Sequence, residues 1–366
     1  MFPTLALDFL NGLKLAFENS GKENFVPELI VESVGNATGK SLLDAAEKMI
    51  LQEEVDLTIS FCSVFNLKEL VSIFDAYKKP LIHVDLGGNI LKEEHTGPFV
   101  IHHTLNLWQS AYYAGVYAAN AFGKKGALAT SFYDGGYHLI ESFVCGFTEN
   151  GGNVVFNYVS PMDYKSESFL SMVEGIQNSN PDFIFTLFSY KEGNKIFKVI
   201  SESPLNGKIP LLAAPLMTEE INNYKNYNIE NVFSIASWAF DEQFDPMNDF
   251  ISNYSKLYED YPNIISLLGY EVGLTIARCI DKNGVITKKI GDCVCAIKVN
   301  TPRGELTFSG FNESQVSLNN IRKMLFADDR AKNTVVQTID SINQDELYDK
   351  FKDLPYSGWQ NPYIIT

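Results

Sequence analysis

The sequence has few of the features that mark nucleic-acid binders and membrane-spanning chains. It contains only four arginines, and its 45 acidic residues outnumber its 29 basic ones, which gives a formal net charge of −16. Nucleic acids and anionic membranes are bound by positively charged surfaces, so both are disfavoured as partners. No apolar run approaches the roughly 20 residues that cross a bilayer. We therefore expect a globular chain that neither binds nucleic acid nor spans a membrane.

Cysteine is also scarce. The five cysteines are too few for a disulfide scaffold and lack the second pair that a structural zinc site needs. Either a disulfide joins Cys279 to Cys293 or Cys295, or all of them are free thiols, and the odd count leaves at least one unpaired. The first residues lack a cationic segment followed by a cleavage site, so any export signal would have been removed or not included.

What is present is a long, regular alternation of strand and helix patterns. A chain of 366 residues, 45% of them hydrophobic, is too long for one small core, which predicts two packed lobes. Strands alternating with helices predict parallel sheets whose ligands bind at the carboxyl ends of the strands. The first series has helices over 5–18, 41–51 and 67–77 and strands over 28–33, 55–60 and 80–84.

A second series follows an extended segment at 99–104 and a helix at 108–122. No flexible linker separates the two series, so we expect the chain to cross between the lobes more than once. The predicted fold class is α/β, with two lobes. The second series has strands over 126–131, 153–158, 182–188, 209–213 and 232–236, with helices over 137–149, 166–177, 193–201 and 218–224. The rest of the chain has helices over 250–258 and 264–280, a hairpin from 303 and a strand at 335–339.

No catalytic constellation can be assembled from the sequence. The loop from Gly35 to Ser41 has three residues between its glycines, whereas a phosphate-binding loop has four. His102 and His103 are adjacent on a predicted strand, so their side chains point to opposite faces and cannot share a metal. Neither a dinucleotide fingerprint nor a nucleophile elbow is present. We expect a binding protein rather than an enzyme, with no cofactor and no metal.

Several strings, in this order and spacing, resemble the type I periplasmic binding proteins of bacterial ABC importers, specifically the leucine/isoleucine/valine-binding family. The resemblance implies two Rossmann-like lobes joined by three hinge crossings, with a small polar molecule enclosed between them. It covers most of the chain. The strings are VDLTISFCS at 55–63, PLIHVDLG at 80–87, the segments KKGALA, YDGG and GGNVV between 124 and 155, NPDFIFTLFSY at 180–190, GYEV at 269–272 and RGELTFSG at 303–310.

The resemblance places the hinge crossings near Thr104, at 238–241 and at 327–334. Lobe one would be residues 1–104 with 242–328, and lobe two 105–241 with 329–366. Members of the family begin with a central strand of the first sheet, whereas this sequence starts after it. Unpaired strand edges are costly when buried. We therefore expect either a longer natural protein or a segment from elsewhere that fills the gap.

The first lobe offers two ligand loops by this resemblance. Ser63, with Cys62 beside it, is placed to bond a carboxylate, although a serine before a helix often only caps it. Asp85, followed by Leu86 and Gly87, stands where the family has a small residue. Its carboxylate could hold an ammonium group or a hydroxyl, or could equally cap the following turn.

The second lobe offers the remaining candidates. Tyr133 and Tyr190, with Ser189, would close the cleft, and the tyrosine loop departs from the family pattern. Met217-Thr218-Glu219 occupies the loop where relatives place an acid for the ligand ammonium; alternatively, Glu219 is an acid at a helix start. Phe2 is a further wall residue. Because of the departures, branched-chain specificity does not follow from the resemblance.

The resemblance implies an extracytoplasmic solute-binding protein that captures an amino acid or similar small polar molecule for the membrane permease of an ABC importer. Its location would be periplasmic or extracellular, and a lipid anchor is compatible with that. We expect a monomer. The alternative is a ligand-binding sensory or receptor domain of the same fold.

Overall fold

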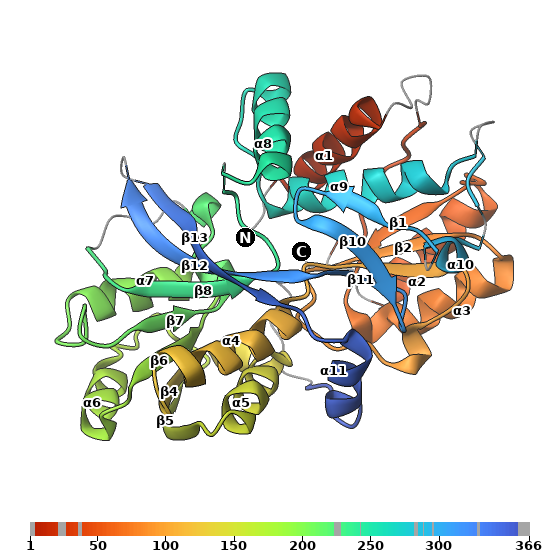
Figure 1. The fold of residues 1–366 in the computed structure, drawn as a ribbon. Coiled ribbons are helices and arrows are strands. Elements are labelled where there is room, and N and C mark those ends of the chain that lie inside the picture. Colours follow the sequence, from red (N-terminus) through yellow and green to blue (C-terminus); the bar gives the residue numbers. More distant parts are fainter. Residues whose placement is uncertain are drawn as a thin grey trace.

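The computed structural model describes residues 4–20, 27–35, 39–222, 228–241, 243–281, 285–287, 289–294, 296–327 and 330–357. Their strands form two sheets with helices packed against them, and each sheet is the centre of one lobe (Figure 1). The predicted α/β architecture of two lobes is confirmed. Within these ranges no helix combines the length and the apolar character needed to span a membrane.

The first lobe is built on a six-stranded sheet. Its β1, β2 and β3 run parallel, as the alternation of strands and helices predicts, and β10 pairs antiparallel with both β9 and β11. In spatial order the strands are β1 (Thr58–Phe61), β2 (Leu81–Val84), β3 (Val100–His103), β11 (Glu313–Val316), β10 (Gly304–Ser309) and β9 (Val299–Thr301).

Two helices of the first lobe, α1 (Leu5–Asn19) and α9 (Ile264–Cys279), pack with their backbones in contact. A Cβ atom at Gly12 would lie 1.9 Å from the carbonyl oxygen of Ser266, and one at Gly269 would lie 2.1 Å from that of Phe9. Only glycine permits so close a crossing. The other helices of this lobe are α2 (Gly39–Leu51), α3 (Leu67–Tyr77), α8 (Asp245–Tyr258) and α10 (Ile290–Val294).

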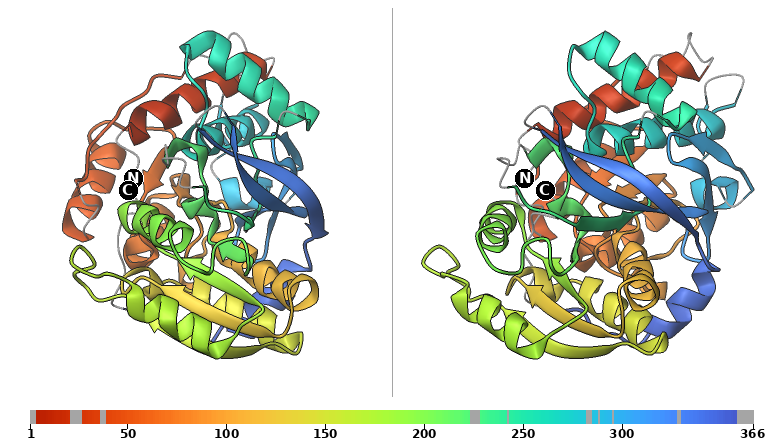
Figure 2. Two further views of the ribbon diagram at one scale, coloured as in Figure 1. Left: turned by 90° about the vertical axis from the view of Figure 1, so that its left-hand side faces the viewer. Right: turned by 60° about the vertical axis from the view of Figure 1, so that its left-hand side comes forward.

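The second lobe is built on a seven-stranded sheet. Five strands from β8 to β5 run parallel, and β12 and β13 add an antiparallel ribbon, which Figure 2 shows as a long hairpin. In spatial order the strands are β13 (Arg330–Asp340), β12 (Leu318–Ala327), β8 (Val232–Ala236), β7 (Leu211–Ala213), β6 (Phe183–Leu187), β4 (Lys125–Thr130) and β5 (Asn153–Val159); the helices are α4 (Leu107–Ala121), α5 (Leu139–Glu149), α6 (Leu170–Ser179) and α7 (Tyr190–Ser201). The last helix, α11 (Gln344–Phe351), follows β13 and bonds through Gln344 and Tyr348 to Glu313 on β11 of the first sheet.

The strand predicted over 28–33 is wrong. Residues 27–34 form no strand, and the apolar side chains of Leu29, Ile30 and Val31 are exposed by 38%, 40% and 62%. Among the described residues no segment pairs with this apolar stretch, and a strand forms only beside a partner with which it shares a hydrogen-bonded ladder. The helix predicted over 218–224 is also wrong in type, because the described part forms only the short 3₁₀ turn η5 (Glu220–Asn222).

Within the described ranges, the chain passes between the two sheets at three places. The first crossing joins β3 to α4, and the second follows β8, close to the predicted positions. The third lies at Ser317, between β11 of the first sheet and β12 of the second, and not at 327–334. Residues 318–327 therefore belong to the second sheet, although the predicted division assigned them to lobe one. The remainder of that division stays a prediction.

Candidate functional site

The loops after β1 and β2 bring five candidate residues together. These strands are adjacent and parallel, with Phe61 opposite Val84, so Cys62 and Ser63 lie beside the loop Asp85–Gly87. The Ser63 hydroxyl oxygen accepts a hydrogen bond from the Phe65 N–H at 3.3 Å and caps the 3₁₀ turn η1 (Val64–Asn66). Ser63 is half-buried, and its hydroxyl hydrogen remains able to donate to a ligand.

Asp85 is held inside its own loop. Its Oδ1 accepts from the Gly87 N–H at 2.6 Å, which confirms the capping alternative, and its Oδ2 lies 3.9 Å from His83 Nε2. Burial raises the pKa of Asp85, while His83 and the Gly87 N–H act in the opposite direction. Gly87 has a φ of +76°, and a Cβ there would lie 2.8 Å from the backbone nitrogen of Asn106. The loop therefore requires glycine at this position.

The carbonyl oxygens of this loop connect it to the second lobe. The Leu107 N–H donates to Leu86 O at 3.3 Å, and the Trp108 N–H donates to Gly87 O at 2.8 Å. Both donors lie at the start of α4, directly after the first crossing. Leu86 is only 3% exposed, so its side chain packs in the core. The ligand loop after β2 is thus fixed against the hinge.

In the second lobe, Tyr133 and Ser189 are half-buried at the ends of β4 and β6. The Tyr133 ring packs edge-to-face on Phe132, with centroids 5.2 Å apart. Ser189 stands at the N-cap position of α7, yet its side chain makes no capping hydrogen bond. The side chain of Tyr190 and all of Phe2 lie outside the described residues.

Met217, Thr218 and Glu219 are buried. The Thr218 hydroxyl donates to Ser234 Oγ at 3.0 Å, and the Met217 sulfur accepts from the Phe188 N–H at 3.3 Å. They follow β7, on the same sheet as Ser189 and Tyr133. The loop of Met217 is therefore packed against the loop after β6.

Glu219 already has a cationic partner. Its Oε1 accepts from Arg322 Nη1 at 3.0 Å and from the Trp238 indole N–H at 3.1 Å. Burial raises the pKa of Glu219 to about 7, although Arg322 lowers it. The residue expected to hold a ligand ammonium is thus largely neutralised within its own lobe.

Sequence reasoning missed a polar cluster at the carboxyl edge of the second sheet. The Ser160 hydroxyl donates to Glu192, which is 2% exposed, and burial raises the pKa of Glu192 while Ser160 and Ser131 lower it. A signal was present, because a serine follows each of the parallel strands β4, β5 and β6, as Ser131, Ser160 and Ser189. Such strand ends meet at one edge of a sheet.

A second missed feature joins the lobes at His138. Its backbone N–H donates to Gly88 O at 3.2 Å, and its Nδ1 accepts from the Ile90 N–H at 3.0 Å. Its Nε2 donates to Pro355 O at 3.2 Å, and its ring stacks on Tyr356, with centroids 5.3 Å apart. These contacts join the loop after β2, the start of α5 and the C-terminal segment. No sequence pattern links positions so far apart.

The hinge contains a buried ion pair. Arg303 Nε donates to both oxygens of Glu271, at 2.9 and 3.0 Å, and Arg303 Nη1 donates to Ser237 Oγ at 2.9 Å. The Ser237 hydroxyl donates in turn to Leu105 O at 2.6 Å. The first and second crossings are thereby held together.

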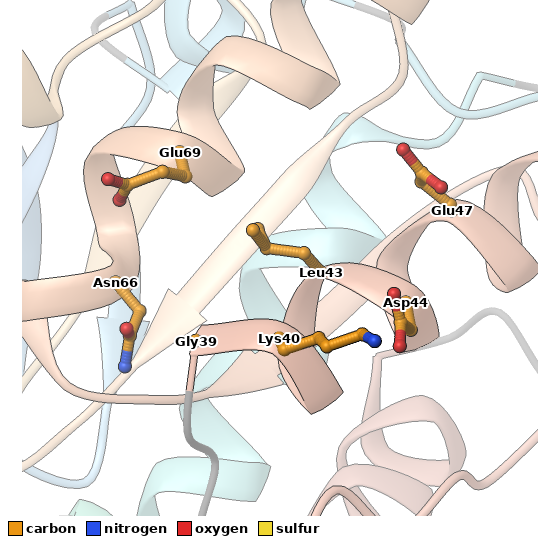
Figure 3. A pocket seen from close by; sticks show the side chains of 7 residues that line it. All are labelled: Gly39, Lys40, Leu43, Asp44, Glu47, Asn66 and Glu69. Atoms are coloured by element: carbon orange, nitrogen blue, oxygen red, sulfur yellow. The ribbon is translucent and has the colours of Figure 1, made fainter.

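A surface cavity of about 470 Å³ lies between α2 and the start of α3 (Figure 3). None of the candidate ligand residues lines it. Among the described side chains no group of three or more histidines, cysteines or acids could hold a metal ion. The cavity is lined by Gly39, Lys40, Leu43, Asp44, Glu47, Asn66 and Glu69.

Solved structures share this fold. A substrate-binding protein of an ABC transporter from Sphaerobacter thermophilus is 18% identical, with a TM-score of 0.81 over 92% of this chain and 94% of that one. A solute-binding protein from Rhodopseudomonas palustris BisB5, in complex with 3,4-dihydroxybenzoic acid, is 20% identical (TM-score 0.77; 94% and 95% covered). A putative branched-chain amino acid ABC transporter protein from Rhodospirillum rubrum is 14% identical (TM-score 0.70; 91% and 96% covered).

The family is established by the sequence itself. A comparison with curated proteins gives no match. The family profile described as "Periplasmic binding protein" matches residues 5–315, which is most of the chain and includes both lobes. This confirms the resemblance found in the sequence. The chain belongs to the periplasmic binding protein family, whose members bind their ligands and are not enzymes.

Proposed function

We propose that this chain is the solute-binding component of an ABC importer, which encloses a small carboxylic acid between its two lobes outside the cytoplasm and presents it to a membrane permease. The family membership supports a binding role. The observation that carries the proposal is the pair of half-buried serines, Ser63 and Ser189, at the carboxyl ends of parallel strands in different lobes. In α/β sheets, ligands bind at these strand ends.

The charges around the candidate loops favour a carboxylate over an ammonium group. A carboxylate is bound well by hydroxyls and by free N–H groups at strand-to-helix turns. Ser63 can donate its hydroxyl hydrogen, and Ser189 makes no capping bond. An ammonium group would need a free acid, but Asp85 faces His83 and Glu219 is bonded to Arg322.

Two classes of small acid share this carboxylate chemistry. The Rhodopseudomonas neighbour is in complex with a dihydroxybenzoic acid, and the Rhodospirillum neighbour is named for branched-chain amino acids. The carboxyl side chains of Asp85 and Glu219 already have cationic neighbours and are not free to bind an ammonium group. We therefore expect aromatic acids to bind this chain more tightly than α-amino acids do. This ranking is the sharpest point of the proposal.

Thermal unfolding in the presence of benzoic acids, α-amino acids and the matching amides tests the proposal. A ligand that binds only the folded state at 100 times its Kd adds about 2.7 kcal/mol of stability and raises Tm. We expect at least one acid to raise Tm and its amide not to raise it. Calorimetric titration of that acid then measures its affinity.

The serine variants locate the site. Ser63→Ala and Ser189→Ala should each weaken binding of that acid about tenfold, the equivalent of one hydrogen bond to a charged group. Ser72→Ala is the matched control, because the Ser72 hydroxyl donates to Lys68 O within the exposed face of α3. Equal stabilisation by acid and amide, or turnover of any compound in the panel, would contradict the proposal.

A further inference from the structure

Two histidines face each other inside the first sheet. His83 on β2 lies opposite His102 on β3 in the parallel register, so both side chains are on the same face of the sheet. Both residues are fully buried, and their Nδ1 atoms are 3.2 Å apart. The separation is that of a hydrogen bond between the two rings.

The outer nitrogens of the two rings fix the number of protons. His83 Nε2 lies 2.9 Å from Cys62 O, and His102 Nε2 lies 3.0 Å from His95 O. A carbonyl oxygen can only accept, so each Nε2 must carry a hydrogen. The facing Nδ1 atoms need one further hydrogen, because one must donate and the other accept. Three hydrogens on two imidazole rings give the pair one positive charge.

We propose that His83 and His102 share one proton between their Nδ1 atoms, and that this buried imidazolium positions the two ligand loops of the first lobe. His83 donates to Cys62 O in one loop and faces Asp85 in the other, whose Oδ1 holds the Gly87 N–H. The shared charge therefore links the loop after β1 to the loop after β2. The consequence for ligand binding rests on the proposed function, whereas the proton count does not.

The groups around the pair are consistent with one positive charge. The Asp85 carboxylate, 3.9 Å from His83, is its counter-ion. His95 uses its Nδ1 to accept from the Lys92 N–H, and burial lowers its pKa to about 4, so it stays neutral. The remaining titratable neighbours are the thiol of Cys62 and the carboxyl group of Glu313, whose pKa burial raises to about 7.

The direction of each shift agrees with this assignment. Burial opposes charge on His83, but Cys62 and Asp85 outweigh it and raise its pKa to about 9. Burial and the charge of His83 hold the pKa of His102 well below its ordinary value. A raised histidine pKa gives stability that is complete below about pH 6.5 and is lost as the pH rises to about 9.

Nitrogen-15 NMR of the histidine rings tests the proton count without any ligand. The chain has only five histidines, so selective labelling gives a simple spectrum. At pH 7.5 we expect both Nε2 atoms of the pair to be protonated and a single hydrogen to couple to both Nδ1 atoms. If both rings are neutral and the pair carries only two N–H hydrogens in total, the proposal is overturned.

Hydrogen exchange tests the positioning role. In the wild-type chain, exchange of the Gly87 amide should accelerate beyond its intrinsic base dependence as the pH passes about 9. In His102→Gln, whose amide cannot hold the charge, that step should vanish and exchange should already be faster at pH 7.5. His95→Gln is the control, because it removes a histidine outside the pair and keeps the carbonyl that His102 uses. A Gly87 amide that behaves alike in all three chains would refute the positioning role, even if the proposed ligand binds.

Discussion

Two buried arginine–glutamate pairs, one in each lobe, differ in how firmly the glutamate holds its charge. Glu271 of the first lobe is fully buried and accepts from Arg303 Nε and Nη2 and from His103 Nε2 at 3.1 Å. These donors outweigh burial and lower its pKa to about 2. Glu219 of the second lobe, which is 2% exposed, accepts from one Arg322 nitrogen and from an indole, and burial raises its pKa to about 7.

The comparison shows that burial alone does not set the charge of such a pair. Both carboxyl groups lose almost all contact with water, which disfavours the ionised form of each. Glu271 is bound through both its oxygens by a charged fork, whereas Glu219 has one charged donor and the negative Glu220 as its neighbour. Glu271 therefore stays ionised near neutral pH and forms an ion pair with Arg303 at the hinge. Glu219 can gain or lose a proton in that range.

The largest expected effect comes from Arg303→Met. This change leaves Glu271 buried without its arginine, so the group must either keep an unpaired charge or take up a proton, and it removes the bond from Arg303 to Ser237 of the second crossing. Breaking one side of a buried pair costs about 3–5 kcal/mol. Urea denaturation at pH 7.5 should show this decrease in the free energy of unfolding. A decrease below about 1 kcal/mol would mean that the Arg303–Glu271 pair does not hold the hinge together.

A smaller, pH-dependent effect is expected from Arg322→Met. Because Glu219 can take up a proton, the decrease in the free energy of unfolding should be about 1–3 kcal/mol at pH 8 and smaller at pH 6. The sign follows from the raised pKa: the folded state binds more protons than the unfolded one between about pH 4.5 and 7, so Glu219 lowers stability as the pH rises through that range. Glu271 behaves oppositely, since its contribution is complete above about 4.5 and is lost as the pH falls to about 2.

Stability curves from pH 5 to 8 for the wild type, Arg322→Met and Arg303→Met measure this difference. We expect Arg303→Met to lower the free energy of unfolding already at pH 5, where Glu271 of the wild type is charged, and Arg322→Met to lower it mainly above about pH 7, where Glu219 of the wild type has lost its proton. Parallel curves for the two variants would remove the distinction between the pairs.

The smallest effect is expected from a matched pair of serine changes. Ser237→Ala removes the acceptor of Arg303 Nη1 and the donor to Leu105 O, and Ser234→Ala removes the acceptor of Arg322 Nε at 3.1 Å. Each should cost about 1 kcal/mol, and Ser237→Ala more, because Ser237 also joins two crossings. Chemical denaturation of the two variants measures how much free energy of unfolding each has lost. A larger loss in Ser234→Ala than in Ser237→Ala would contradict the expected ranking.

Most of the fold could be predicted from the sequence because its elements have strong local patterns. The helix expected over 67–77 is α3 (Leu67–Tyr77), and the strand expected over 153–158 is β5 (Asn153–Val159). Residues 28–33 carry an equally good strand pattern but form none. A strand needs a paired neighbour, and local pattern cannot show whether that neighbour is in place.

The candidate site was less predictable. The capping roles of Ser63 and Asp85 were foreseen as alternatives, because each depends on residues only two positions away. The partner of Glu219 was not, since Arg322 is 103 residues distant in the sequence. Which of the candidates contact a ligand remains a prediction.

Local patterns in the sequence are enough to predict most of the succession of strands and helices, the parallel strands in each sheet and the membership in a family of binding proteins. These properties depend on periodicity and on short strings, which are local. Tertiary structure alone decided that the third crossing lies at Ser317, that His83 meets His102, and that Glu271 and Glu219 hold their charges differently. Each of these depends on the distances and the burial that arise when remote segments pack together, and those quantities are not written in the order of the residues.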